Sequence, residues 1–294
     1  MSKVSILMPI FNEECFLRES IESVLGQSYE DFELIIIDDF STDQSYLIAE
    51  EYSFKDSRIK LIRNLKKGKV SAFNLGFKKS SGDFICFFAG DDIMHKDSIF
   101  NRSSCLKKDV NSFIASASKV KTISDTIRFN DVVIPKNKNR GTLVGGAVMF
   151  NVHLGRKIFP IPEQLPNEDR WTELHIRFFS KITHIPIVSL FYRIHSGNSS
   201  SRLNSFKEKN IEMHERFIVF QLFRDKYNSE LSNDNRFFLD RMAFAEQLRY
   251  NGRTLSLLFM KGLNIKDKMR FLFHSNRMLY YIRLKLFSFF SGWG

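Results

Sequence analysis

Two pairs of adjacent carboxylates in the first hundred residues, Asp38-Asp39 and Asp91-Asp92, each follow a short apolar run. Like charges held this close destabilise each other unless a cation or a hydrogen-bond donor compensates. Paired carboxylates beside a ligand are suited to holding Mg²⁺ or Mn²⁺ against a diphosphate. One such pair is commonly a turn or a helix cap. Two pairs in similar positions indicate a binding site.

The elements that position these pairs alternate between strand-like and helix-like patterns. Apolar runs near residues 4–10, 34–37, 58–62 and 84–88 fit strands that are covered on both faces, and segments of helical periodicity separate them. This alternation predicts a parallel α/β sheet with right-handed crossovers. Ligands of such sheets bind beyond the carboxyl ends of the strands, where both acidic pairs would lie.

Composition narrows the classes of protein. The chain has 294 residues, of which 43% are hydrophobic and 26% charged, so we expect one large domain with an appendage or two small domains. No apolar run approaches the ~18 residues of a spanning helix, and the first residues lack the apolar core of a signal peptide. Cys15, Cys86 and Cys105 show no C-x-x-C spacing, which indicates neither disulfides nor a zinc site. We therefore expect a cytoplasmic protein.

Several motifs together resemble the family 2 glycosyltransferases, which have the GT-A fold. In chain order they are residues 4–13 (VSILMPIFNE), 23–29 (SVLGQSY), 32–43 (FELIIIDDFSTD), 74–76 (NLG), 82–92 (GDFICFFAGDD), 168–169 (ED) and 192–195 (YRIH). The resemblance covers roughly residues 3–200 and leaves out the C-terminal third.

The resemblance implies an α/β fold with a mostly parallel, Rossmann-like central sheet flanked by helices and followed by a helical C-terminal extension. We expect a catalytic domain at residues 1–204, with a nucleotide-binding half at about 1–110 and an acceptor half at about 111–204. Residues 205–294 would form a basic, aromatic-rich helical region. The implied reaction transfers a hexosyl or N-acetylhexosaminyl group from a nucleoside diphosphate sugar, most simply a UDP-sugar, to an acceptor hydroxyl with inversion.

The resemblance also implies roles for individual residues. On the donor side, the nucleotide would contact Pro9, Phe11, Glu13, Asp39, Lys69 and Asp91. Phe11 would form an aromatic wall for the base, Asp39 would accept its N–H, and Glu13 and Asp91 would hold the ribose. Asp92 and His195 would bind a divalent cation, Mn²⁺ or Mg²⁺. The lysine run around Lys69 is equally typical of a solvated helix start, and a lone histidine is often only exposed.

On the acceptor side, Asp169 would be the general base that takes the acceptor proton as the oxygen attacks. Glu168 and Trp171 would contact the acceptor. The alternative for Glu168 and Asp169 is that both carboxylates cap the helix that follows.

One departure from the family pattern affects the metal prediction. The family commonly has Asp-x-Asp-Asp after the fourth strand, whereas this chain has Ala89-Gly90-Asp91-Asp92. One carboxylate of the family pattern is missing, so we expect a weaker metal site than the family pattern gives. A catalytically degenerate membrane- or nucleic-acid-binding module is therefore one alternative. A sugar-phosphate nucleotidyltransferase is another, although it would need a Gly-rich phosphate loop near the first strand.

Charge is distributed unevenly along the chain. Residues 1–100 carry 12 Lys/Arg and 17 Asp/Glu, a net charge of −5, whereas residues 101–294 carry 32 and 16, a net charge of +16. Within residues 261–287, seven cations alternate with large apolar side chains, and Phe289, Phe290 and Trp293 follow. This pattern predicts peripheral association with an anionic membrane surface. The alternative is that these apolar residues pack onto the catalytic domain.

Membrane contact suits an acceptor glycan carried on a polyprenyl diphosphate. We therefore expect a role in bacterial surface polysaccharide synthesis (O-antigen, capsule or lipopolysaccharide) at the inner face of the cell membrane. Nucleic acid is not an expected partner.

Overall fold

The computed structural model describes residues 2–106, 112–195, 197 and 205–287. The chain divides into two compact units, residues 1–198 and 199–293, which are described separately. The predicted Phe289, Phe290 and Trp293, and most of the polar loop after His195, lie outside the described residues.

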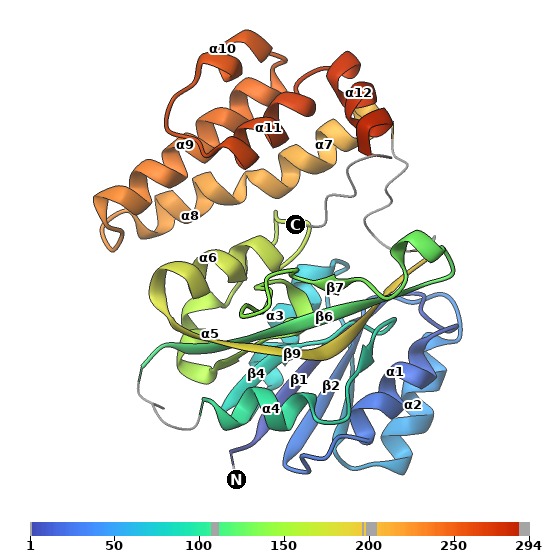
Figure 1. Cartoon of the computed structure of the whole chain (residues 1–294). Helices are drawn as coiled ribbons and strands as arrows, with labels where there is room; N and C mark the ends of the chain where they lie inside the picture. Colours follow the sequence, from blue (N-terminus) through green and yellow to red (C-terminus); the bar gives the residue numbers. More distant parts are fainter. Residues whose placement is uncertain (1, 107–111, 196, 198–204, 288–294) are drawn as a thin grey trace. The chain divides into compact units, whose positions relative to one another are not determined.

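The first unit is built on a mixed sheet (Figure 1). Its strands are β1 (Val4–Ile10), β2 (Phe32–Asp38), β3 (Ile59–Arg63), β4 (Phe84–Phe87), β5 (Ile93–Met94), β6 (Ile114–Ser124), β7 (Val133–Ile134), β8 (Val148–Asn151) and β9 (Lys181–Ile194). The strand order is β3-β2-β1-β4-β8-β6-β9-β5, with β7 paired to β6. The strands β3, β2, β1 and β4 are parallel to one another, as predicted, whereas β8 and β5 join antiparallel.

Helices cover both faces of this sheet. They are α1 (Leu17–Leu25), α2 (Ser45–Lys55), α3 (Lys69–Lys79), α4 (Ser98–Ser104), α5 (Val152–Ile158) and α6 (Asp169–Phe179), with short turns η1 (Ile127–Phe129) and η2 (Gly145–Ala147). All seven residues of β1 are buried, because alternate side chains face opposite layers of helices. The fold class expected from the sequence is confirmed.

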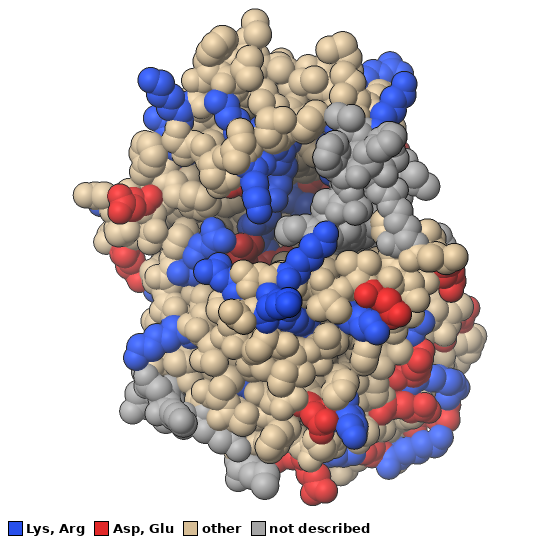
Figure 2. Space-filling model, in the orientation of Figure 1, with Lys and Arg blue, Asp and Glu red and all other residues tan. Residues whose placement is uncertain are grey.

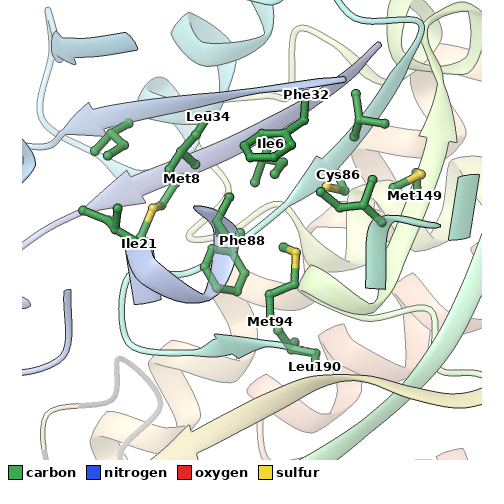
Figure 3. Close-up of a cluster of buried hydrophobic side chains, with 14 of the residues drawn as sticks. Ile6, Met8, Ile21, Phe32, Leu34, Cys86, Phe88, Met94, Met149 and Leu190 are labelled. Carbon is green, nitrogen blue, oxygen red and sulfur yellow. The ribbon is translucent and has the colours of Figure 1, made fainter. Parts of the chain in front are cut away.

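One layer of the core lies between the sheet and α1, α2 and α4. Ile6, Met8 and Leu34 from β1 and β2 pack with Ile21 of α1, and Phe88, which follows β4, belongs to the same cluster (Figure 3). On the opposite face, α3 approaches so closely that a Cβ on Gly76 would lie 2.8 Å from Ile37. These two layers fix the ends of β1, β2 and β4, where the predicted site residues begin.

The second unit is helical. It contains α7 (Phe206–Phe217), α8 (Val219–Tyr227), α9 (Asn233–Tyr250), α10 (Thr254–Phe259), α11 (Ile265–Phe273) and α12 (Arg277–Phe287). A buried ion pair lies at its centre: Arg249 is fully buried, and its Nε donates to Glu246 at 2.7 Å and its guanidinium to the Asn210 side chain. Among the helices of the described residues, none has both the length and the apolar character needed to cross a membrane.

Candidate active site

The carboxyl ends of three adjacent parallel strands bring the first acidic residues together. β1 pairs with β2 on one side and with β4 on the other. Glu13 follows β1, Asp39 follows β2 and Asp91 follows β4, so all three lie at one edge of the sheet. This edge is the expected location of a ligand site in an open α/β sheet.

Asp39 is only 7% exposed and is surrounded by polar groups that donate hydrogen bonds to it. Its Oδ1 accepts hydrogen bonds from the Asn64 side chain and from the Gly68 backbone N–H, both at 2.8 Å. Gly68 has φ +142°, a conformation that favours glycine and that turns its N–H toward the carboxylate. Oδ2 accepts the same Gly68 N–H at 3.1 Å. A carboxylate oxygen has a second lone pair, which could accept one further donor such as a nucleobase N–H.

Glu13 points against the backbone of Gly90, on the loop that carries Asp91. A Cβ on Gly90 would lie 1.8 Å from Glu13 Oε2, so only glycine leaves room for this carboxylate. Oε2 is buried and has no hydrogen-bond partner among the described residues. Burial raises the pKa of Glu13 well above its ordinary value, and the Asp91 carboxylate raises it further. An unsatisfied buried acceptor fits hydroxyl donors such as those of a ribose.

Replacing Gly90 with alanine would displace the Glu13 carboxyl group and is therefore expected to weaken nucleoside diphosphate binding by about 10- to 100-fold, because losing a buried hydrogen bond costs ~1–3 kcal/mol. Isothermal titration calorimetry of Gly90→Ala measures this change. The matched control is Gly26→Ala, because Gly26 has an ordinary helical-end conformation and a Cβ there would lie 3.3 Å from its nearest neighbour, the Glu22 carbonyl oxygen. If Gly90→Ala bound the nucleoside diphosphate as tightly as wild type does, the proposed contact between Glu13 and the nucleotide would be contradicted.

Asp91, Asp92 and His195 form a second cluster, where the loop between β4 and β5 meets the end of β9, the strand with which β5 pairs. His195 Nε2 lies 3.1 Å from Asp91 Oδ2, and its ring packs against Phe16 with centroids 4.7 Å apart. The Arg193 backbone N–H donates to Asp92 Oδ1 at 2.9 Å. Burial and the Asp91 carboxylate raise the pKa of Asp92, which the contact with Arg193 only partly offsets. Of the two residues predicted to bind metal, His195 thus contacts Asp91, and Asp92 contacts the backbone of Arg193, two residues before His195.

Lys69, the first residue of α3, links the strand-end carboxylates with those of α6. Its Nζ lies 3.4 Å from Glu168 Oε2. Burial alone would lower the pKa of Lys69, but the nearby Glu168, Asp169 and Asp91 carboxylates raise it overall. The ammonium group is therefore held in its charged form between the two groups of acids.

Asp169 is positioned by the glycine turn before β8. The Gly145 backbone N–H donates to Asp169 Oδ1 at 3.0 Å, and Gly145 adopts φ +50°. A side chain at position 145 would be strained by this φ value. Asp169 itself is partly exposed, so its other carboxylate oxygen is available to a ligand.

Glu168 differs from Asp169 in being nearly completely buried. Burial raises its pKa to about 7, with Lys69 opposing this shift and Asp169 adding to it. A carboxyl group with a higher pKa in the folded chain than in the unfolded chain stabilises the fold below the unfolded pKa. That contribution is lost as the pH rises through the folded pKa.

The variant Glu168→Gln should remove this dependence. Between about pH 5 and about pH 8, we expect its free energy of unfolding to rise relative to wild type by up to about 3 kcal/mol. Denaturant unfolding at both pH values measures the difference. Glu173→Gln, on the next turn of α6, provides the control. If the free energies of unfolding of wild type and Glu168→Gln changed equally with pH, the raised pKa of Glu168 would be contradicted.

The structure corrects the prediction for Trp171. Its side chain is fully buried, and its indole N–H donates to the Ile158 carbonyl at 2.8 Å. It therefore anchors α6 to the end of α5 and does not contact an acceptor. Pro9 is also buried, within β1 opposite Ile37, so of the predicted aromatic wall only Phe11 presents a surface. Phe11 is 43% exposed, with the Lys67 ammonium 4.7 Å from its ring centre.

Sequence reasoning missed several residues that hold the site together. Arg193 binds both residues of the second pair. Its backbone N–H donates to the Asp92 carboxylate, and its Nε donates to the Asp91 backbone carbonyl at 2.9 Å. Its place in the Tyr-Arg-Ile-His motif was a signal that could have indicated a role. Asn64, Gly68 and Gly90 gave no comparable signal, because their roles depend on contacts with residues distant in sequence.

This combination of a parallel half-sheet, strand-end carboxylates and a second acidic pair on a helix defines a GT-A class of fold. Solved structures agree: the chain matches TarS from S. aureus, in a crystal structure of residues 1–349 with UDP-GlcNAc, with a TM-score of 0.62 at 17% identity. That match covers 96% of this chain and 84% of the other. The mannosyltransferase PcManGT from Pyrobaculum calidifontis, in complex with GDP-Man and Mn²⁺, matches with a TM-score of 0.58 at 14% identity, covering 96% and 86%.

Sequence comparison assigns the family. Residues 5–141 match the model of glycosyl transferase family 2. The Escherichia coli enzyme WfgD, named as UDP-Glc:alpha-D-GlcNAc-diphosphoundecaprenol beta-1,3-glucosyltransferase, is 32% identical over 213 residues, which are 70% of this chain and 81% of that protein. The chain belongs to the family 2 glycosyltransferases. It spans only 18% to 40% of the length of four other curated bacterial relatives, which are 36% to 43% identical over shorter segments.

Proposed function

We propose that this chain is an inverting glycosyltransferase that moves a sugar from a nucleoside diphosphate sugar to a hydroxyl of a lipid-linked glycan in bacterial surface polysaccharide synthesis. In this reaction a bond forms between the acceptor oxygen and the anomeric carbon. The bond from that carbon to the β-phosphate oxygen breaks, and the nucleoside diphosphate leaves. The acceptor proton passes to Asp169. The product has the inverted configuration because attack comes from the face opposite the leaving group.

The observation that carries this proposal is the position of Lys69 among two groups of carboxylates. Glu13 and Asp91 belong to the strand-end group, and Glu168 and Asp169 to the helix α6 group. Donor and acceptor must meet between a nucleotide site and a general base, and Lys69 interacts electrostatically with both sides. Its ammonium would also attract the donor diphosphate, for which a lysine is a common ligand.

On the donor side, the supported assignments are Asp39 for the base, Glu13 and Asp91 for the ribose, and Phe11 for stacking. The Asp39 carboxylate, held by Asn64 and Gly68, would accept an imide N–H, which uracil presents. The structural likeness to TarS, solved with UDP-GlcNAc, also supports a UDP-sugar as the donor.

A divalent cation fits the second acidic cluster when it arrives with the diphosphate. Within the part of the chain that the structure describes, no group of three or more His, Cys, Asp or Glu side chains could hold a metal ion. Asp92 and His195 would supply two ligands and phosphate oxygens the others. A carboxylate combined with substrate phosphates is the usual set for Mg²⁺, and the His195 imidazole would add a nitrogen ligand, which Mg²⁺ does not prefer. The raised pKa of Asp92 is that of a buried charge without sufficient compensation. The cation would neutralise charge on the departing nucleoside diphosphate.

For the acceptor, the name of the WfgD enzyme supports a sugar carried on a polyprenyl diphosphate. We propose the same acceptor class for this chain. The sequence-based prediction places Glu168 against the acceptor, but its side chain is only 2% exposed. We propose that Glu168 instead positions Asp169, whose carboxylate is close enough to raise the pKa of Glu168. The acceptor sugar itself would contact the partly exposed side of Asp169.

Thermal-shift titration with UDP, GDP, dTDP and CDP, each with and without Mn²⁺, tests the proposal. A ligand at about 100 times its Kd stabilises the fold by about 2.7 kcal/mol, so nucleotide selectivity is measured directly. We expect the largest shift with UDP and a larger shift when Mn²⁺ is present. A chain that responds to none of the four nucleotides would contradict the donor assignment and favour a degenerate site.

A further inference from the structure

The most exposed apolar side chains of the helical unit lie on α10 and at the start of α11. Leu255 is 72% exposed, Phe259 77% and Ile265 71%, and Leu258 lies on the same side of α10. Leu255, Leu258 and Phe259 share one helix face because they are spaced i, i+3 and i+4. Apolar side chains this exposed, and this close in sequence, indicate a binding surface.

The opposite side of α10 is anchored in the helical unit. Leu257 is fully buried and Met260 is 7% exposed. The following turn packs onto α9: Gly262 adopts φ +85°, and a Cβ there would lie 3.0 Å from Phe237 and 3.1 Å from Arg241. The exposed leucines and phenylalanine are therefore presented by a packed element.

Cations flank this apolar face along the chain. Residues 251–285 contain eight Lys/Arg and a single acid, Asp267, which pairs with Arg270 at 3.2 Å. Arg253, Lys261, Lys266 and Lys268 form no ion pair within the described residues. In Figure 2 the visible surface over α10 is mostly uncharged, with Lys and Arg at its margins.

We propose that this surface, which we call the α10 surface, binds an anionic lipid bilayer. It comprises the apolar Leu255, Leu258, Phe259 and Ile265 and the cations Arg253, Lys261, Lys266 and Lys268. A bilayer interface accepts apolar side chains at the level of the acyl chains and cations at the level of anionic headgroups. The surface offers both in one place.

Other occupants match this surface less well. A second copy of the chain would bring the same unpaired cations into contact with each other, which disfavours a symmetric dimer. Nucleic acid would be attracted by the cations but would leave four large aliphatic and aromatic side chains exposed to water.

The location differs from the sequence-based prediction for residues 261–287. Some apolar residues of that segment pack inside the helical unit and cannot contact a membrane, since Phe271 and Tyr280 are buried and Leu272 is 8% exposed. The structure adds α10, which precedes the segment and carries two of the most exposed apolar side chains. This inference does not depend on the reaction that the chain catalyses.

Sedimentation of the full chain with vesicles tests the proposal. Vesicles of phosphatidylcholine alone are compared with vesicles that contain phosphatidylglycerol. We expect wild type to bind the anionic vesicles at least about tenfold more tightly, since each cation near such a surface contributes about 1 kcal/mol. The variant Leu258→Ser/Phe259→Ser should bind them at least about tenfold more weakly. Lys261→Glu/Lys266→Glu should lose the preference for phosphatidylglycerol.

Phe54→Ser/Ile127→Ser is the matched control, because it removes two highly exposed apolar side chains from the other unit. Its vesicle binding should equal that of wild type, and melting temperatures should show that all variants fold. The proposal is overturned if wild type binds neither vesicle, or if the α10 variants bind as well as the control. It is also overturned if the α10 variants change only self-association or DNA binding.

Discussion

Replacing Asp169 with asparagine is expected to lower the turnover number by about 10²- to 10⁴-fold, the usual contribution of a general base. The amide cannot take the acceptor proton, but its oxygen can still accept the Gly145 N–H that now binds Asp169 Oδ1. The local structure should therefore persist. The nucleotide Kd should not change, because the donor would contact residues at the strand ends.

Two measurements separate this role from a structural one. Release of nucleoside diphosphate, with a bacterial lipid extract as the source of acceptor, gives turnover, and calorimetry gives nucleotide affinity. Glu173→Gln is the matched control on the same helix, where Glu173 pairs with Arg170 at 2.7 Å. It should retain near-normal turnover.

The neighbouring Glu168 provides the alternative outcome. Its pKa of about 7 would suit a general base, but its carboxylate is buried against Lys69. If Asp169→Asn retained near-normal turnover while Glu168→Gln lost it, the general base would be Glu168. A fall in nucleotide affinity equal to the fall in turnover would instead assign Asp169 to donor binding.

The parallel half of the fold could be predicted because its strands are buried on both faces. Such strands are continuous apolar runs, and the residues 34–37 before Asp38 illustrate this pattern. The acids that follow then share an edge through topology alone. The site residues Asp39, Asp91 and Asp169 were all identified from motifs, and their chemical roles stay predictions.

What the sequence did not indicate depends on contacts between distant residues. Glu13 and Gly90 are 77 positions apart in the chain, and nothing in either segment shows that the Glu13 carboxylate needs the absence of a Cβ at position 90. Arg193 binds Asp92 through a backbone N–H, which any residue except proline could supply. Trp171 lies on the apolar face of a helix, and that pattern fits a core residue and an acceptor platform equally well.

The α10 residues were overlooked for the opposite reason. The run Leu255-Ser256-Leu257-Leu258-Phe259 reads as part of a core, yet only Leu257 of these five is buried. Burial of one side of a six-residue helix cannot be distinguished from burial of all of it when the sequence is apolar on both sides. Tertiary packing decided which side chains remained exposed.

Asp92→Asn is expected to reduce transfer at least about 10³-fold, because a metal ligand next to the departing diphosphate stabilises charge that develops in the transition state. The amide oxygen can still accept the Arg193 N–H, so the loop before β5 should keep its structure. The additional thermal shift that Mn²⁺ gives with UDP should disappear, whereas the shift with UDP alone should remain. Asp97→Asn, in the same segment at the start of α4, is the control.

The alanine at position 89 allows a second variant that should strengthen metal binding. If Asp92 and His195 are the two protein ligands, then Ala89→Asp restores the carboxylate that the family commonly has and should lower the Mn²⁺ concentration needed for half-maximal turnover. The order of metal affinity should then be Ala89→Asp, wild type and Asp92→Asn, from tightest to weakest. If Asp92→Asn kept both near-normal transfer and the Mn²⁺-dependent shift, Asp92 would not be a metal ligand. The buried Asp92 carboxylate would then be compensated by Lys69 and the Arg193 N–H alone.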